Sequence, residues 1–228
     1  MNGMLLLDKP KGFTSHDVVD FVRRHFKIKK VGHTGTLDPN ATGLLILLLG
    51  NFTKLSGRLT NMKKDYSATL LLGLTTDTQD IGGKIIAEKP ADEIKTDEIK
   101  KVFSSFKGKL LQIPPMVSAK RIQGKRFYEL SRQGKVIERR PVEIEIFDIR
   151  IQNIRLPEVD FFVSCSKGTY VRALCEDIGN SLGCGGCLKD LQRLAVGNFM
   201  LKDAISFEML KKLTAETLHT HLLQYAHI

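Results

Sequence analysis

The sequence predicts an α+β protein, in which helices flank a central mixed sheet that is mainly antiparallel. From residue 142 to 146, Val and Ile alternate with Glu, which is the period-two pattern of a half-exposed strand. Between residues 96 and 106 the apolar side chains recur at helical spacing instead. Segments of these two kinds follow one another without the strict strand–helix–strand alternation that a doubly wound sheet requires.

The first half of the chain predicts three strands and a helix. Residues 4–7 read as a short apolar strand that the turn DKPKG closes. Ser15 is a suitable N-cap for a helix over residues 16–26, whose apolar side chains share one face. The apolar run 44–49 predicts a buried strand, and residues 66–72 predict a further one.

The second half predicts a strand pair followed by helices. The strand that starts at residue 142 has a neighbour at 159–165, and a turn with a helix follows. This turn and helix cover residues 168–182. A last strand is expected at 193–199, and helices at 206–212 and 215–225.

Charge is concentrated in one segment. The 228 residues carry a formal net charge of +10, which favours polyanionic partners such as nucleic acid. Residues 120–140 contain eight basic and two acidic side chains, with Phe127 and Tyr128 among them. This pattern indicates an element that grips phosphates, although a solvated helix face has the same composition. The basic residues predicted to bind RNA are Lys120, Arg121, Lys125, Arg126 and Arg132.

Several classes of protein are disfavoured. The longest apolar run is far shorter than the roughly 20 residues of a membrane span, and no signal peptide is expected. Cys184 and Cys187 form a CxxC pair that suggests a redox or zinc site, but no second ligand pair has suitable spacing. A turn with small side chains is the favoured interpretation. No nucleotide-binding motif is present, so we expect no cofactor and no metal.

Two segments offer groups for chemistry. The loop GHTGTLDPNATG (32–43) places His33 and Asp38 beside the buried strand, where catalytic groups are common; an ordinary Asp-Pro turn is the alternative. The segment SCSKGTYVR (164–172) puts Tyr170 and Arg172 at the first turn of a helix. An arginine there opposes the helix dipole, so a carboxylate partner is expected, either a distant one or Glu176 one turn on.

Four stretches of the chain together resemble the TruB family, the bacterial tRNA pseudouridine-55 synthases. They are LLLDKPKGFTSHDVV (5–19), VGHTGTLDPNATGLL (31–45), KDYSATLLLGLTTDTQD (64–80) and CSKGTYVRALCEDIG (165–179). Two weaker stretches, IPPMVSAKRIQGKRFYELSRQG (113–134) and LQRLAVG (191–197), match in the same order. The resemblance covers nearly all of residues 1–200 and implies the pseudouridine synthase fold. Residues 1–228 would form one catalytic domain, with an RNA-clamping insertion at about 114–140.

The resemblance also implies roles for particular residues. Asp38 matches the catalytic aspartate, the nucleophile, and Arg172 the arginine that pairs with it and orients it. Tyr66 matches the tyrosine that stacks on the target base. His33, Tyr170 and Leu191 match substrate-binding positions. The remaining match, Lys9-Pro10, falls in a motif of packing and support.

The implied activity is isomerisation of uridine 55 in the T arm of tRNA to pseudouridine. No atom is gained or lost, so no cofactor is needed, and the base must be flipped out of its stack. Asp38 would attack ribose C1′, add to the ring or remove the 2′ proton. We expect a cytoplasmic, monomeric protein, with tRNA as partner and no membrane association.

The C-terminal segment departs from the family pattern, and, separately, two other functions are open. Bacterial members usually carry a C-terminal PUA module, whereas residues 201–228 predict only two short helices, in a naturally short or a truncated chain. A non-catalytic RNA-binding or tRNA-folding protein on the same scaffold is one alternative. A pseudouridine synthase with another RNA target is the second.

Overall fold

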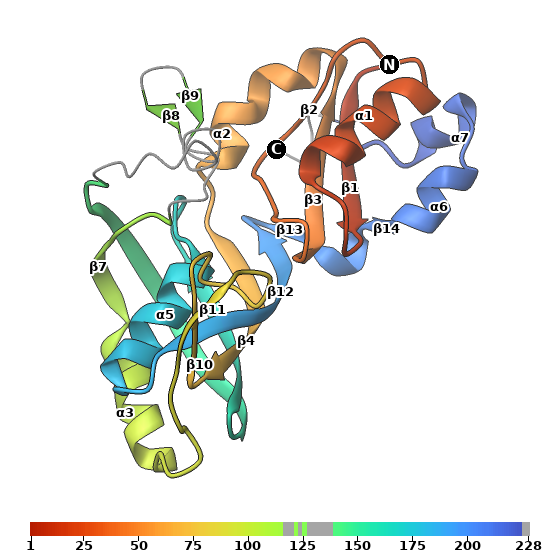
Figure 1. Ribbon diagram of the computed structural model, residues 1–228. Coiled ribbons are helices and arrows are strands. Elements are labelled where there is room, and N and C mark those ends of the chain that lie inside the picture. Colours follow the sequence, from red (N-terminus) through yellow and green to blue (C-terminus); the bar gives the residue numbers. More distant parts are fainter. Residues whose placement is uncertain (116–120, 123–124, 127–138, 225–228) are drawn as a thin grey trace. The chain divides into compact units, whose positions relative to one another are not determined.

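The structure, a computed structural model, describes residues 1–115, 121–122, 125–126 and 139–224. The chain divides into two compact units, shown in Figure 1. The first comprises Met1–Tyr66 and Leu191–Ile228, and the second comprises Ser67–Asp190. Two strands carry residues of both units, namely β4 (Lys64–Leu72) and β12 (Gly186–Val196).

The first unit is built on a mixed sheet with the strand order β14-β1-β3-β12, in which β2 also pairs with β3 and β13 with β12. Its strands are β1 (Gly3–Lys9), β2 (Val31–His33), β3 (Thr42–Leu49), β13 (Phe199–Met200) and β14 (Ile205–Ser206). Its helices are α1 (Ser15–His25), η1 (Gly50–Leu55), α2 (Ser56–Thr60), η2 (Leu201–Asp203), α6 (Phe207–Lys212) and α7 (Ala215–Thr220). β3 pairs antiparallel with β1 and β2 and parallel with β12.

β3 is buried on both faces, which explains its continuous apolar sequence. Leu45, Leu47 and Leu49 belong to one core cluster, together with residues of α1, α6 and α7. Leu44, Ile46 and Leu48 belong to a second cluster, with residues of η1 and α2. The strand that follows the Asp38 loop is therefore the central strand of this unit.

The start of α1 differs from the expectation by one residue. Thr14, not Ser15, is the N-cap, and its side chain forms a capping box with Asp17. Ser15 is instead the first helical residue and is buried. Its hydroxyl is therefore available to the loop before β3, because Thr14 already caps the helix.

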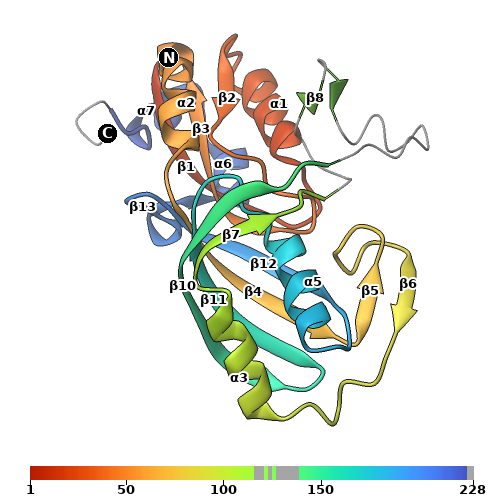
Figure 2. The same ribbon diagram turned by 90° about the vertical axis from the view of Figure 1, so that its left-hand side faces the viewer.

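The second unit has the strand order β4-β11-β10-β7, and its long strands are antiparallel. Its own strands are β5 (Leu74–Thr76), β6 (Ile85–Glu88), β7 (Gly108–Gln112), β8 (Arg121–Ile122), β9 (Lys125–Arg126), β10 (Val142–Arg155) and β11 (Glu158–Cys165). Its helices are α3 (Thr96–Ser105) and α5 (Val171–Ser181), which Figure 2 shows beside these strands. The Phe103 ring of α3 meets the Phe161 ring of β11 edge to face, with centroids 5.3 Å apart.

Two expected elements have other bounds in the structure, the strand at 193–199 and the helix at 215–225. β12 begins at Gly186 and ends at Val196, because Gly197 adopts a positive φ and the chain turns back into β13. α7 ends at Thr220, and Leu223 forms an antiparallel bridge to Met4 instead. α5 begins at Val171, after an extended Tyr170, which agrees with the turn and helix expected at 168–182.

The predicted fold class is confirmed. Antiparallel pairs predominate, the pairs β1·β14 and β3·β12 are parallel, and helices pack on the strands. The two cysteines of the CxxC pair lie on either side of the turn that starts β12; Gly185 between them has a φ of +77°. All four cysteines of the chain are buried and none forms a disulfide. No helix in the described part of the chain is long and apolar enough to cross a membrane.

Candidate active site

Asp38 lies half-buried in the loop between β2 and β3, and the backbone on both sides of it is held. Before it, the amide of buried Leu37 donates to Ser15 Oγ at 2.8 Å, and Ser15 Oγ donates to the Leu37 carbonyl at 3.3 Å. After it, the Pro39 carbonyl accepts a bond from the Gly12 amide at 2.8 Å, and the Asp38 carbonyl accepts one from Ala41. The loop therefore presents its carboxylate from a fixed backbone.

Two buried cations lie behind this loop. Arg193 on β12 is 1% exposed, and its guanidinium donates to the carbonyls of Leu44 at 2.7 Å, Gly35 at 3.0 Å and Thr36 at 3.5 Å. Lys9 at the end of β1 is fully buried, and its ammonium donates to carbonyl oxygens. Its acceptors are Pro10 at 2.8 Å, Phe13 at 2.6 Å and Pro39 at 3.4 Å.

The charges near Lys9 act in opposite directions. Burial lowers the pKa of Lys9 from 10.5 to about 8, and the neighbouring Arg193 charge adds to this effect. The Asp38 carboxylate raises the pKa of Lys9, and it does so more strongly than any other acid near Lys9. The charges of Asp38 and Lys9 are therefore near enough to influence each other.

His33 lies half-buried at the end of β2, directly before this loop. Its Nδ1 accepts a hydrogen bond from the Gly35 amide at 3.3 Å. Burial lowers the pKa of His33 below its ordinary value of 6.5, and the nearby Arg193 charge lowers it further. The imidazole is therefore neutral at pH 7, and its Nε2–H can serve as a donor to a substrate.

Leu191 and Tyr66 also belong to the first unit. The Leu191 carbonyl accepts a bond from Thr42 Oγ1 at 3.5 Å, and the adjacent β12 residues pair with the start of β3. Tyr66 lies on β4 and is 8% exposed. The ammonium of Lys64, two residues earlier, donates to the carbonyls of Thr60 and Met62 and so anchors the start of that strand.

Arg172 and Tyr170 lie in the second unit, at the start of α5. The Tyr170 amide donates to Gln112 Oε1 at 2.8 Å, and Gln112 Nε2 donates to the Tyr170 carbonyl. Arg172 is 6% exposed and donates to the Thr78 carbonyl at 3.1 Å. It forms an ion pair with Asp80 at 3.4 Å. Asp80 is therefore one carboxylate partner of the kind that the position of Arg172 on the helix requires.

Asp80 is a residue that the sequence did not single out. Its Oδ1 accepts hydrogen bonds from Thr78 Oγ1 at 3.0 Å and from the Gly82 amide at 2.9 Å, so its carboxylate is fixed before Arg172. Glu176, the alternative partner of Arg172, accepts a hydrogen bond from Gln79 Nε2. The pairing of Arg172 with Asp38 joins residues of different units and stays a prediction.

The basic segment is described only in part. Lys120 and Arg132 lie outside the described residues. Arg121 lies on β8 and Lys125 and Arg126 on β9, and these two short strands pair antiparallel. Their role in binding RNA stays a prediction. The sequence signal that could have identified Ser15, Asp80 and Arg193 is their presence as polar residues inside the matching motifs.

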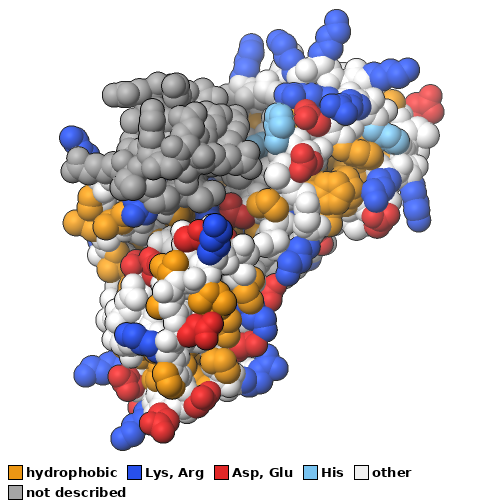
Figure 3. Space-filling view, viewed as in Figure 1, with side chains coloured by type: hydrophobic (Ala, Val, Ile, Leu, Met, Phe, Trp, Pro, Cys, Tyr) orange, Lys and Arg blue, Asp and Glu red, His pale blue; other side chains and the backbone are white. Residues whose placement is uncertain are grey.

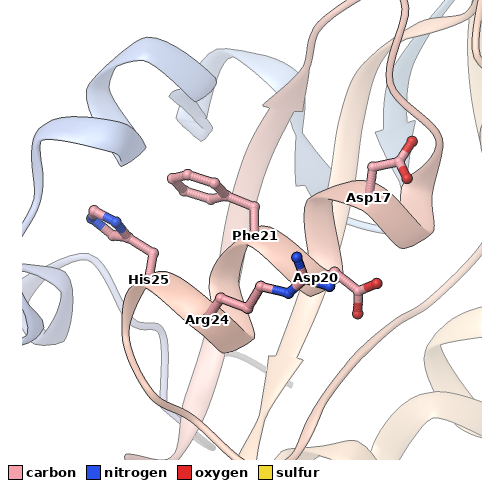
Figure 4. Close-up of a pocket in the computed structure, with 5 residues that line it drawn as sticks. All are labelled: Asp17, Asp20, Phe21, Arg24 and His25. Atoms are coloured by element: carbon pink, nitrogen blue, oxygen red, sulfur yellow. The ribbon is translucent and has the colours of Figure 1, made fainter.

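A pocket lies along α1. Figure 4 shows the residues that line it, which are Asp17, Asp20, Phe21, Arg24 and His25. None of the predicted site residues belongs to this set. Within the described ranges, no group of three or more His, Cys, Asp or Glu is arranged to hold a metal ion.

Two family models match the chain in succession. The TruB family pseudouridylate synthase N-terminal domain matches residues 23–171, and the tRNA pseudouridylate synthase B C-terminal domain matches residues 172–225.

Similar curated proteins carry the name tRNA pseudouridine synthase B. The relative from Clostridium tetani is 48% identical over 208 residues, which are 91% of this chain and 72% of that protein. The relative from Alkaliphilus oremlandii is 50% identical over 213 residues, 93% of this chain and 71% of the relative. The relative from Syntrophotalea carbinolica is 45% identical over 226 residues, 99% of this chain and 74% of the relative.

Similar solved structures come from larger assemblies. A chain of a Cbf5-Nop10-Gar1 complex has a TM-score of 0.73 and 28% identity over 92% of this chain. A chain of an H/ACA RNP bound to a substrate RNA containing 2'-deoxyuridine has a TM-score of 0.70 and 25% identity over 98% of this chain. This chain spans 53% and 56% of their lengths.

Proposed function

Because the chain belongs to the TruB family of pseudouridylate synthases, we propose that it isomerises uridine 55 in the T arm of tRNA to pseudouridine. The match of nearly the whole chain to proteins named tRNA pseudouridine synthase B carries the proposal. Residues 1–228 form the catalytic domain, with the basic insertion at about 114–140. The enzyme acts in the cytoplasm as a monomer.

Asp38 carries out the reaction. Isomerisation breaks the bond between ribose C1′ and uracil N1, turns the base and rejoins it through C5, and a single positioned carboxylate can serve on any of three routes. It attacks C1′, adds to the uracil ring or removes the 2′ proton. The hydrogen bonds on both sides of Asp38 support this role, because a fixed backbone keeps the carboxylate where the base is delivered.

The remaining residues bind the flipped nucleotide and orient Asp38. Tyr66 stacks on the base and replaces stacking lost on flipping, worth about 1–3 kcal/mol. His33, Tyr170 and Leu191 contact the nucleotide. Arg172, whose guanidinium is buried beside Asp80, also pairs with Asp38 and keeps it ionised and oriented.

The RNA is held through its phosphates. Besides the segment at 114–140, the first unit has exposed cations on and after α1, at Arg24, Lys27, Lys29 and Lys30. Figure 3 shows Lys and Arg side chains projecting from the surface around this helix. Cations of this kind fix an RNA by its backbone without reading sequence.

The deciding experiment compares wild type with Asp38→Asn on a tRNA transcript and on a minimal T-arm stem-loop. We expect pseudouridine at position 55 from wild type with both RNAs, and a loss of at least about 10³-fold with the variant, which keeps the shape but not the charge. A transcript with cytidine at position 55 is the control and should yield no product.

Each other outcome has a distinct meaning. Equal product from both proteins would remove Asp38 from the mechanism. No product from either, with tight tRNA binding, would favour the non-catalytic RNA-binding or tRNA-folding protein. Inactivity on the stem-loop together with product on another RNA would point to a synthase with a different target.

A further inference from the structure

We propose that Ser15 and Arg193 are positioning residues for the reaction: from the protein interior they fix the three residues before Asp38 and thereby aim its carboxylate. This inference rests on the proposed function of Asp38. It assigns a catalytic consequence to a buried hydroxyl and a buried guanidinium. Their hydrogen bonds go to backbone atoms of the loop and of β3, so both groups act through the backbone and not on the substrate.

Ser15 lies at the start of α1 but does not cap it. A serine there ordinarily caps the helix, but Thr14 does so here, with its side chain accepting from the Asp17 amide. The hydroxyl of Ser15, which is 1% exposed, instead both accepts from the Leu37 amide and donates to the Leu37 carbonyl. One side chain therefore satisfies both backbone groups of the residue directly before Asp38.

Arg193 fixes Gly35 and Thr36, the two residues before Leu37. Its guanidinium presents donors in one rigid plane, and they reach the carbonyls of Gly35 and Thr36 as well as that of Leu44 in β3. The hydrogen bond to the Leu44 carbonyl fixes the guanidinium plane to β3, the central strand of the first unit. The loop is thus fixed relative to β3 by a group 158 residues further along the chain than Gly35.

The choice of acceptors argues for a positioning role. A buried cation normally pairs with a carboxylate, because desolvation of an unpaired charge is costly. Arg193 is 1% exposed, and within the described part of the chain its hydrogen bonds all go to backbone carbonyls. An apolar side chain of similar size would fill the space without this cost, so the guanidinium is explained by the carbonyls it orders.

A displacement of the carboxylate by about 1 Å can cost about 10²-fold in rate. Arg193→Lys keeps the charge but replaces the planar fork with one ammonium, which cannot reach all three carbonyls in the same way. We expect kcat to fall about 10- to 100-fold. Ser15→Ala removes one hydroxyl and keeps a strong helix former, and we expect a fall of about 5- to 20-fold. Neither side chain is exposed to RNA, so KM should change less than about twofold.

The test combines single-turnover kinetics on the T-arm stem-loop with hydrogen exchange of residues 35–41. The Leu37 amide should be protected in wild type and should lose protection in Ser15→Ala, while amides within α1 keep theirs. Arg193→Lys should accelerate exchange across 35–41. Leu210→Ala, in the fully buried core of α6, is the control: it should lower the melting temperature and leave both the loop exchange and kcat at wild-type values.

The proposal is overturned if folded Ser15→Ala exchanges residues 35–41 as wild type does, or if it loosens that segment and keeps wild-type kcat. Should Arg193→Lys fail to fold, Ser15→Ala alone decides the outcome. Activity of Asp38→Asn would instead refute the proposed role of Asp38, and it would leave the exchange result unaffected, so the two failures can be told apart.

Discussion

At the scale of single residues, the first unit buries two cations that hold backbone rather than carboxylates. Lys9 and Arg193 both lie in the interior, and their donors reach carbonyls on opposite sides of Asp38. Burial, together with the neighbouring Arg193 charge, lowers the pKa of Lys9 to about 8. Lys9 therefore gives the fold a pH dependence that can be measured.

The unfolding free energy should rise with pH because of Lys9. Its pKa is about 8 in the folded protein against 10.5 ordinarily, so between these values the folded chain carries it neutral and the unfolded chain carries it charged. Unfolding then takes up a proton. The unfolding free energy therefore rises by up to about 1.4 kcal/mol for each pH unit in this range. Lys9→Met removes this contribution.

Urea unfolding of both proteins at pH 8 and at about pH 10 checks this prediction. Wild type should gain stability relative to Lys9→Met as the pH rises. A difference between the two proteins that does not change with pH would show that Lys9 titrates alike in the folded and unfolded states.

The sequence indicated the chemical groups of the site better than their supports. Asp38 and His33 stood out as a carboxylate and an imidazole on a glycine-rich loop, and an arginine at a helix start required an acid. One acid that meets this requirement, Asp80, lies in a turn that tertiary contacts bring to α5. The sequence predicts Ser15 as the N-cap because serine suits that position, whereas Thr14 occupies it in the structure.

At the scale of elements, the contact between β3 and β12 depends on Gly43. Its φ is +98°, and an added Cβ would lie 2.4 Å from the Arg193 carbonyl oxygen. Backbone approaches backbone here, so no side chain can move aside to make room. The absence of a side chain at this position is what allows β12 to bring Arg193 to the Asp38 loop.

Gly43→Ala should therefore lower the unfolding free energy by about 3 kcal/mol or more, through left-handed strain and displacement of β12. Gly12→Ala is the matched control: its φ is +87°, but nothing lies within 4 Å of the added Cβ. We expect a cost of only about 1–2 kcal/mol there, from strain alone. Denaturant unfolding measures the unfolding free energy of both variants. Equal losses would show that β12 moves away from the added Cβ at no energetic cost.

Element positions followed from periodicity wherever the packing is regular. The helix at 96–106 and the strand pair after residue 142 were predicted correctly because one face of each is buried. The end of α7 was not, because Leu223 leaves the helix to pair with Met4, a contact between residues far apart in sequence. Long-range pairing of this kind overrides local helical preference.

At the scale of the whole molecule, the net charge of +10 is spread over more than the basic insertion. Lys27, Lys29 and Lys30 are exposed in the first unit, and the Lys30 carbonyl, which accepts from the Gly50 amide, fixes that loop to η1. The charges of the insertion are clustered within one stretch of sequence, at 120–140. Folding gathers the second set, which includes exposed cations near η1 and α2 such as Lys54 and Arg58.

Removing the charges of Lys29 and Lys30 as glutamines should weaken binding of the T-arm RNA and flatten its salt dependence. Each lost phosphate contact should reduce the slope of log K against log salt by about 0.7–0.9. The adjacent exposed pair Lys100 and Lys101 on α3, changed in the same way, is the control and should retain the wild-type slope. If both double variants behave alike, only total charge matters.

The discontinuity of the first unit has a consequence for synthesis. Arg193, which orders the Asp38 loop, leaves the ribosome long after the loop itself, since 158 residues separate it from Gly35. At about 5–20 residues per second this interval lasts about 8–30 s. During that time the nascent chain lacks the Arg193 bonds to Gly35 and Thr36, so, under the roles proposed for Asp38 and Arg193, its loop reaches full order only after β12 has been made.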